Sequence, residues 1–247
     1  MTLALNLERK AQAAAVVHSH GVPHRRIEEW KYSDLKAVLG EKGLGAVMAE
    51  WLVGNLPSGV EVFDLAQPHP PAWVMDHVAR PSGNVMNAAS LALSAGGVAF
   101  RVPKGLAVAA PLKVDFTGPG HVRALLVVED GASVTLVEGV GACDFRNVGF
   151  EIVLGEKASL EHVRISPNAP DAVLVEEVSL RIAAGGHYRG HFAGFGSKLA
   201  RMELESHAKA PMSLLTPWDP ENAAKMSRSN RSNADEANGD GGAENLF

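Results

Sequence analysis

His187 and His191 are the two histidines whose spacing could serve a metal ion. On a helix, residues four apart lie on one face, as in a zinc-binding pair. These two, however, lie in GGHYRGHFAGFG, a glycine-rich segment among expected strands. On a strand, residues four apart are separated by roughly 13 Å, too far to share one ion. We therefore expect histidines of a turn and a sheet surface here, without a metal.

Three further polar residues could line one face of a sheet, namely His121, Glu138 and His162. The sequence offers nothing that would bring them together. The three histidines within residues 18–24 flank the expected end of a helix, where polar side chains meet free carbonyl groups. None of these sets predicts a catalytic or metal-binding site.

The chain shows no pattern typical of an enzyme. Cys143 lies in GVGACDF without a neighbouring base that would lower its pKa, so we expect an inert thiol. Glu176 and Glu177 are adjacent, so on a strand they would face opposite sides and could not act as an acid/base pair. Nucleotide-binding loops, nucleophile elbows and HExxH motifs are absent from the sequence. We expect a protein that is not an enzyme and has no catalytic residue.

Composition narrows the class of protein further. The 247 residues carry a net charge of −5, so no whole-chain attraction to nucleic acid or to an anionic membrane is expected. A single cysteine excludes an internal disulfide and a thiolate-rich metal site. Glu8, Arg9 and Lys10 interrupt the opening segment where a signal peptide would be apolar. These features predict a cytoplasmic protein.

Helical periodicity is confined to the amino-terminal part. Apolar residues recur at helical spacing over 3–20, with Gly21 as the stop. A second helical stretch is expected over 33–53, capped by Ser33 or Asp34 and broken by the glycines at 43 and 45. We interpret residues 1–54 as a helical region and the proline-rich residues 55–94 as an irregular connection.

From residue 95 to residue 205, short runs of β-favouring residues alternate with turns, and no helix-length segment lies between them. The segment EDGASVTLVE at 129–138 is repeated as GEKASLEHVR at 155–164, an offset of 26 residues. A period of this length is typical of one coil of a β-solenoid, in which successive coils stack. A Greek-key sandwich with similar strand spacing remains the alternative.

Five segments, in this order, resemble the SufB/SufD family of iron–sulfur cluster assembly scaffolds, and its SufD branch in particular. They are PHRRIEEWKYSDL at 23–35, VMNAA at 85–89, VPKG followed by PL within 102–112, HVRALLVVEDGASVTLVE at 121–138 and NVGFEIVLGEKASLEHVRI at 147–165. The resemblance implies amino-terminal helices and a right-handed β-helix. It also implies a scaffold role beside SufB-like and SufC-like partners. A nascent iron–sulfur cluster would then form in the assembled complex, and this chain alone would bind no cofactor.

The match stops near Glu205, and residues 206–247 are expected to form a disordered tail unlike the family. The family's later AQKTDA-like and Cys-x-His-Gly segments are absent from this sequence. Residues that bind the cluster or grip SufC therefore cannot be assigned, and the β-helix is expected to be truncated. A frameshifted tail, an erroneous gene boundary and a naturally short paralogue are the three explanations.

Two hypotheses remain open for parts of the chain. In the family reading, Ile27, Trp30 and Leu35 form an apolar face of the segment at 23–35, and Trp30 and Tyr32 anchor it to the body. The alternative to a scaffold is a β-solenoid or cupin-like module that binds a small ligand or metal near His187 and His191.

Overall fold

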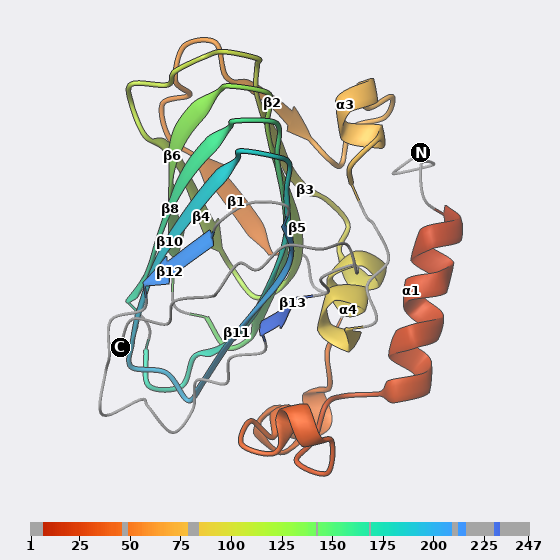
Figure 1. Cartoon of the computed structure of the whole chain (residues 1–247). Coiled ribbons are helices and arrows are strands. Elements are labelled where there is room, and N and C mark those ends of the chain that lie inside the picture. The colour runs from red at the N-terminus through yellow and green to blue at the C-terminus, as the bar shows by residue number, and fades with distance from the viewer. Residues whose placement is uncertain are drawn as a thin grey trace.

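The computed structural model describes residues 7–45, 49–78, 84–141, 143–167, 169–208, 212–215 and 230–232. It is mainly β, with its helices in the amino-terminal part, as predicted. Figure 1 shows two facing sheets of stacked strands, with helices α1 (Leu7–His20) and α4 (Val85–Leu93) on the outer side of one of them. This arrangement is a β-solenoid and not a Greek-key sandwich, because the strands of the repeating body pair in parallel.

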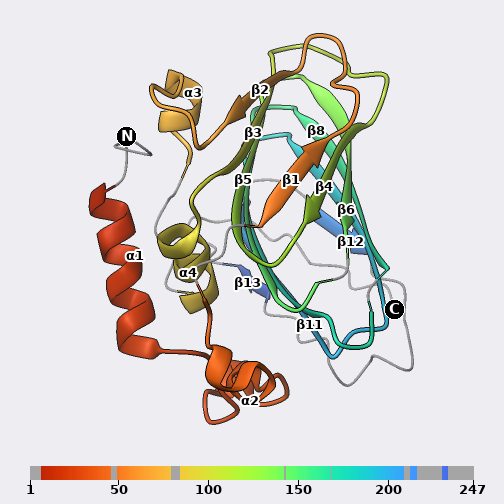
Figure 2. The same cartoon turned by 180° about the vertical axis from the view of Figure 1, so that it is seen from behind.

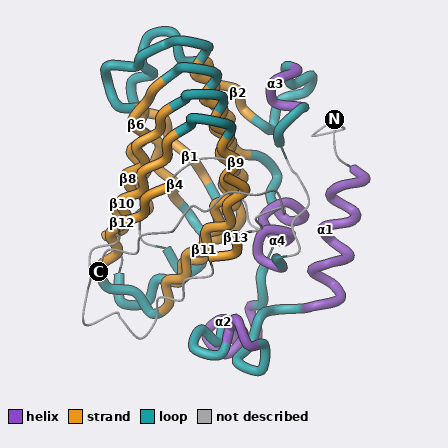
Figure 3. The backbone as a smooth tube through the Cα atoms, viewed as in Figure 1, coloured by secondary structure: helices purple, strands orange, loops and turns teal. Residues whose placement is uncertain are grey.

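The chain alternates between the two sheets as it advances along the solenoid (Figure 3). In the order of pairing, sheet A contains β13 (Asn230–Ser232), β11 (Leu199–Ala208), β9 (Val173–Ile182), β7 (Arg146–Leu154), β5 (Gly120–Val128), β3 (Gly97–Val102) and β2 (Glu61–Asp64). Sheet B contains β1 (Glu50–Val53), β4 (Leu112–Thr117), β6 (Ser133–Val140), β8 (Ser159–Pro167), β10 (His187–Phe195) and β12 (Met212–Leu215).

The 26-residue repeat corresponds to one coil. Ser133 of β6 pairs with Ser159 of β8, so the two Ala-Ser pairs occupy the same place in successive coils. The turns that precede β4, β6, β8 and β10 each contain a residue with positive φ. In this order the residues are Gly105, Gly131, Lys157 and Gly185. The left-handed conformation reverses the chain at the corner, which explains the small, glycine-rich turns in the repeat.

The two sheets differ in what covers their outer faces. Residues of β4 in sheet B alternate between buried and exposed, as expected for a sheet with one face in water. All residues of β5 in sheet A are buried, because α4 and α1 lie over its outer face (Figure 2). Most of the core between the sheets is apolar, with Phe116, Phe150 and their neighbours in one cluster.

Helix α4 is fixed to sheet A by a buried polar network. Arg123 of β5 donates from Nη1 to Asn87 Oδ1 and to Ser90 Oγ, both at 2.9 Å, and pairs with Glu151 of β7. Gly149 leaves room for this network, because a Cβ atom there would lie 2.2 Å from Ser90 Oγ.

The amino-terminal expectations need two corrections. Among the described residues of 33–53, which exclude 46–48, only Leu35–Leu39 (α2) and the 3-10 turn Gly40–Lys42 (η3) are helical, while Glu50–Val53 forms β1, antiparallel to β4. The side chain of Asp34 caps α2 by accepting from Ala37 N at 3.0 Å, as expected. The Trp51 and Val53 side chains pack on the core between the sheets, and this tertiary contact favours a strand there.

The proline-rich residues 55–94 are not simply irregular. They contain β2, the short helix α3 (Ala72–Met75) and α4. Asn84 starts α4, since its side chain accepts from Met86 N at 2.8 Å. A reading based on the prolines misses this helix, although the last of them, Pro81, lies only three residues before the Asn84 cap.

The expected boundary at residue 205 lies inside β11, which continues to Ala208. Within the expected tail, β12 and β13 extend the two sheets by pairing with β10 and β11. The remaining tail residues lie outside the described part of the chain.

Candidate functional site

The segment at 23–35 docks on the last long strand of sheet A. Trp30 is 4% exposed, and its ring centre lies 4.1 Å from the guanidinium carbon of Arg201 on β11. Ile27 and Leu35 belong to the same apolar cluster, which confirms the predicted apolar face. The prediction was wrong for Tyr32, which is 76% exposed. The 3-10 turn Glu28–Trp30 (η2) directs Trp30 inward, and Tyr32 follows it on the outer side.

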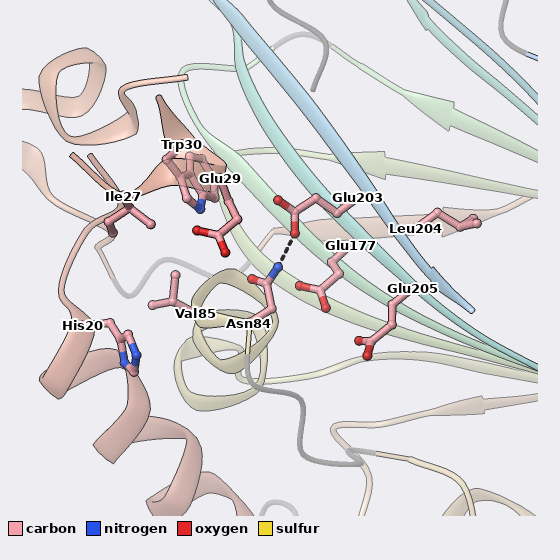
Figure 4. A pocket seen from close by; sticks show the side chains of 10 residues that line it. All are labelled: His20, Ile27, Glu29, Trp30, Asn84, Val85, Glu177, Glu203, Leu204 and Glu205. Atoms are coloured by element: carbon pink, nitrogen blue, oxygen red, sulfur yellow. Dashed lines mark hydrogen bonds between the residues drawn. The ribbon is translucent and has the colours of Figure 1, made fainter. Parts of the chain in front are cut away.

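An acidic pocket of about 320 Å³ opens where this segment meets α4 and sheet A (Figure 4). Its floor includes Glu203 of β11, which accepts from Arg201 Nε at 2.6 Å and from Asn84 Nδ2. Its lining residues are His20, Ile27, Glu29, Trp30, Asn84, Val85, Glu177, Glu203, Leu204 and Glu205. The arginine and the asparagine hold Glu203 in place, and the remaining carboxylates give the pocket a negative character.

Glu177 is the most deeply buried carboxyl group of the acidic pocket. Asn87 Nδ2 of α4 donates to Glu177 Oε1 at 3.1 Å. Burial, together with the nearby carboxylates of Glu203 and Glu205, raises the pKa of Glu177 to about 8. The group is therefore protonated over much of the neutral range, which reduces the negative charge that the fold must bury.

A second polar cluster lies between the two sheets, sealed from water. His162 of β8 bonds to Glu138 Oε2 of β6 at 3.0 Å and to Tyr188 Oη of β10 at 3.1 Å. Arg164 of β8 pairs with Glu176 of β9. We call these five residues the interior cluster, and they link strands of both sheets.

The interior cluster contains two of the three residues that the sequence could not bring together. His162 and Glu138 are in contact, whereas His121 lies on the outer side of sheet A. There its Nε2 bonds to Leu44 O at 2.9 Å, and its Nδ1 lies 3.1 Å from Asn147 Nδ2. Burial lowers the pKa of His162 to about 4, so its ring is neutral. The pairing register of β6 with β8, in which His162 lies opposite Leu136, predicts the contact between His162 and Glu138.

Glu176 and Glu177 do face opposite sides of β9, as predicted. Glu176 contributes to the interior cluster, and Glu177 lines the acidic pocket on the outer face. The adjacent pair therefore serves two separate environments, and it does not act as one acid/base site.

His187 and His191 both lie on β10, and His191 Nε2 is 3.3 Å from Glu161 Oε1 of β8. Within the described ranges, no group of three or more histidine, cysteine, aspartate or glutamate side chains could hold a metal ion.

Burial raises the pKa of the Cys143 thiol, which disfavours the reactive thiolate.

No helix among the described residues is long and apolar enough to cross a membrane.

The sequence of this chain is similar to proteins of iron–sulfur cluster assembly. Residues 117–216 match the family described as SUF system FeS cluster assembly, SufBD core domain. This range covers β5 to β12 almost completely, together with the interior cluster. The chain is also 23% identical, over 81% of its length, to an iron–sulfur cluster assembly SufBD family protein of Synechocystis. It spans 56% of that relative's length.

Proposed function

We propose that the chain belongs to the SufBD family, on the strength of the match of residues 117–216 to the core domain, and that it is a SufD-like scaffold subunit of iron–sulfur cluster assembly. In this role the protein catalyses no reaction of its own. It presents a rigid solenoid surface on which partner subunits assemble in the cytoplasm.

The family match to the solenoid coils is the observation that carries this proposal. The matched residues form continuous parallel pairings from β5 to β11 in sheet A and from β6 to β12 in sheet B. Such a body is rigid, because each coil is hydrogen-bonded to the next along its length. Rigidity of this kind suits a scaffold that must hold other subunits in fixed positions.

The assignment to the SufD branch rests on the ordered segments at 23–35, 85–89 and 121–165. Two of these carry structural roles in this fold. The first provides Trp30, which stacks on Arg201, and the second forms the start of α4 over sheet A. We propose a SufB-like subunit and a SufC-like ATPase as partners, with the nascent cluster as the cargo of the assembled complex.

A pull-down tests the proposal. The chain, tagged at its amino terminus, is co-expressed with the SufB-like and SufC-like proteins of the same organism, and the eluate is analysed for both. Stoichiometric recovery of the SufB-like protein is expected. If a longer SufD protein retains both partners under the same conditions and this chain, shown to be folded by circular dichroism, retains neither, the proposal is wrong.

A further inference from the structure

Two buried glutamates of the interior cluster face one arginine. Glu138 and Glu176 are fully buried, and they come from opposite sheets. Arg164 Nη1 forms an ion pair with Glu176 Oε2, while Arg164 Nε lies 3.7 Å from Glu138 Oε1. One guanidinium therefore stands between two carboxyl groups in the buried interior, where uncompensated charge is costly.

The other polar groups around the pair do not supply a second full counter-charge at short range. Arg146 of β7 donates its hydrogen bonds to backbone carbonyl groups. Its Nε and Nη2 atoms donate to Gly118 O, and its Nη1 atom donates to Gly141 O, at 2.8–2.9 Å. Its charge reaches Glu138 and Glu176 only through space. His162 is neutral, so it has a single N–H. We assign that N–H to Nε2, donating to Glu138 Oε2, and the Tyr188 hydroxyl then donates to Nδ1.

Hydrogen bonding at the two glutamates is incomplete, because the Arg164 Nε donor lies 3.7 Å from Glu138 Oε1, too far for a hydrogen bond. Among the described residues, Glu138 Oε1 and Glu176 Oε1 have no hydrogen-bond partner, although both are buried. The two carboxyl groups converge on the Arg164 guanidinium, and a hydrogen bond between them would satisfy both oxygens. Two ionised carboxylates cannot form that bond, since neither has a proton to donate. A single proton on either residue completes it.

We propose that Glu138 and Glu176 share one proton, and that this acid pair is a pH-sensitive latch between the two sheets. With the proton in place, one carboxyl group donates to the other, and the remaining negative charge faces Arg164. Removal of the proton leaves two carboxylates in contact inside the solenoid, and their repulsion opposes the approach of β9 to β6. The inference concerns the interior of the fold and does not depend on the proposed role in cluster assembly.

The direction of the pKa shifts agrees with this geometry. Burial is the largest cause, and it raises the pKa of Glu138 to about 7 and that of Glu176 to about 8. The two values belong to a coupled pair, so the proton is a property of both residues together. Because the folded state binds this proton more tightly than the unfolded state, its contribution to stability is complete below pH 4.5, declines as the pH rises from 4.5 to about 8, and does not change further above that.

Urea unfolding between pH 6.5 and pH 9 tests the latch in the full chain. The variants are Glu138→Gln and Glu176→Gln, in which the amide supplies a permanent N–H donor in place of the shared proton. Glu156→Gln, at an exposed turn of the same solenoid, is the matched control. In the wild type and the control, the shared proton is expected to raise the unfolding constant by up to tenfold per pH unit up to about pH 8, in addition to the contribution of Glu177, which is common to all four proteins. For each interior variant the dependence should flatten. Equal slopes in all four proteins would overturn the proposal.

A second measurement covers the case in which the interior variants do not fold. Infrared spectroscopy of native Glu177→Gln, which lacks the other buried protonated carboxyl group, detects the C=O stretch of the shared acid. The band is expected at pH 6.5 and should weaken by pH 9 in the folded protein. Its absence at pH 6.5 would mean that both glutamates are ionised and bridged by water, and the latch would be excluded.

Discussion

Arg201 on β11 lies with its guanidinium carbon 4.1 Å from the centre of the Trp30 ring, and it donates from Nε to Glu203 at 2.6 Å. This contact joins the amino-terminal segment to the far end of the solenoid. A cation over an indole ring is stabilising, more so when both groups are removed from water. The acidic pocket lies beside this contact, so its shape depends on the position of Trp30.

Replacement of Trp30 by alanine should therefore destabilise the protein strongly. We expect a loss of about 3–5 kcal/mol in the free energy of unfolding, because a large buried side chain is removed and Arg201 loses its partner. Urea denaturation followed by circular dichroism measures the change. Tyr32→Ala is the matched control, and its effect should stay within about 0.5 kcal/mol, because Tyr32 is exposed. Equal effects of the two changes would contradict the docking of Trp30.

Gly149 should not tolerate a side chain. The Cβ atom of Gly149→Ala would overlap Ser90 Oγ and Arg123 Nη1, so α4 would have to move away from sheet A. We expect a loss of about 1–3 kcal/mol, and faster amide hydrogen exchange in α4. Gly141→Ala provides the comparison, because nothing lies within 4 Å of a Cβ atom there. An unchanged exchange rate in α4 for Gly149→Ala would show that the helix is held in another way.

Lys157 occupies the positive-φ position of its turn, where the equivalent turns of the other coils have glycine. Its φ of 57° is a left-handed conformation that costs an L-residue roughly 1 kcal/mol relative to glycine. Lys157→Gly should therefore raise the thermal midpoint, with a gain of up to about 1 kcal/mol. The reverse change at the equivalent corner, Gly131→Ala, should lower the midpoint by a similar amount. A lower midpoint for Lys157→Gly would indicate that the lysine side chain stabilises the turn.

His162 should make the wild type sensitive to acid. Its folded-state pKa of about 4 lies below the ordinary value of 6.5, so the unfolded state binds the proton first as the pH falls. The contribution of His162 to stability is therefore complete above pH 6.5, and it declines by up to about 1.4 kcal/mol per pH unit between 6.5 and 4.

The acid effect can be separated from that of the glutamates by comparison with His162→Gln. Gln cannot take up a proton, so the difference in unfolding free energy between the wild type and the variant should shrink as the pH falls from 6.5 to 4. Parallel curves over this range would mean that His162 is charged in the folded protein.

Much of the body of the fold could be predicted because the solenoid repeats in sequence. The Ala-Ser pairs at 132–133 and 158–159 are one coil apart, and the adjacent glutamates at 176 and 177 do point in opposite directions. Local patterns were sufficient for these features, since each depends on the alternation of one strand or on the period of one coil.

The interior cluster was not predicted, because the 26-residue offset relates coils within one sheet, whereas the cluster also joins residues of opposite sheets, such as Arg164 and Glu176. Leu136, and not Glu138, is the direct partner of His162, so the histidine reaches the glutamate diagonally across β6 and β8. Tyr32 was misjudged for a related reason. Its charged surroundings are equally compatible with an anchor and with an exposed residue, and only the turn geometry at Glu28–Trp30 separates the two.

The composition of the complex in solution tests the central claim most directly. The chain is co-expressed with the proposed SufB-like and SufC-like partners, and the purified material is analysed by native mass spectrometry together with its iron and acid-labile sulfide content. The scaffold role predicts one defined assembly that contains this chain with the SufB-like subunit and that accumulates iron and sulfide after anaerobic reconstitution. A folded chain that remains alone, while the partners form a complete complex without it, would contradict the role.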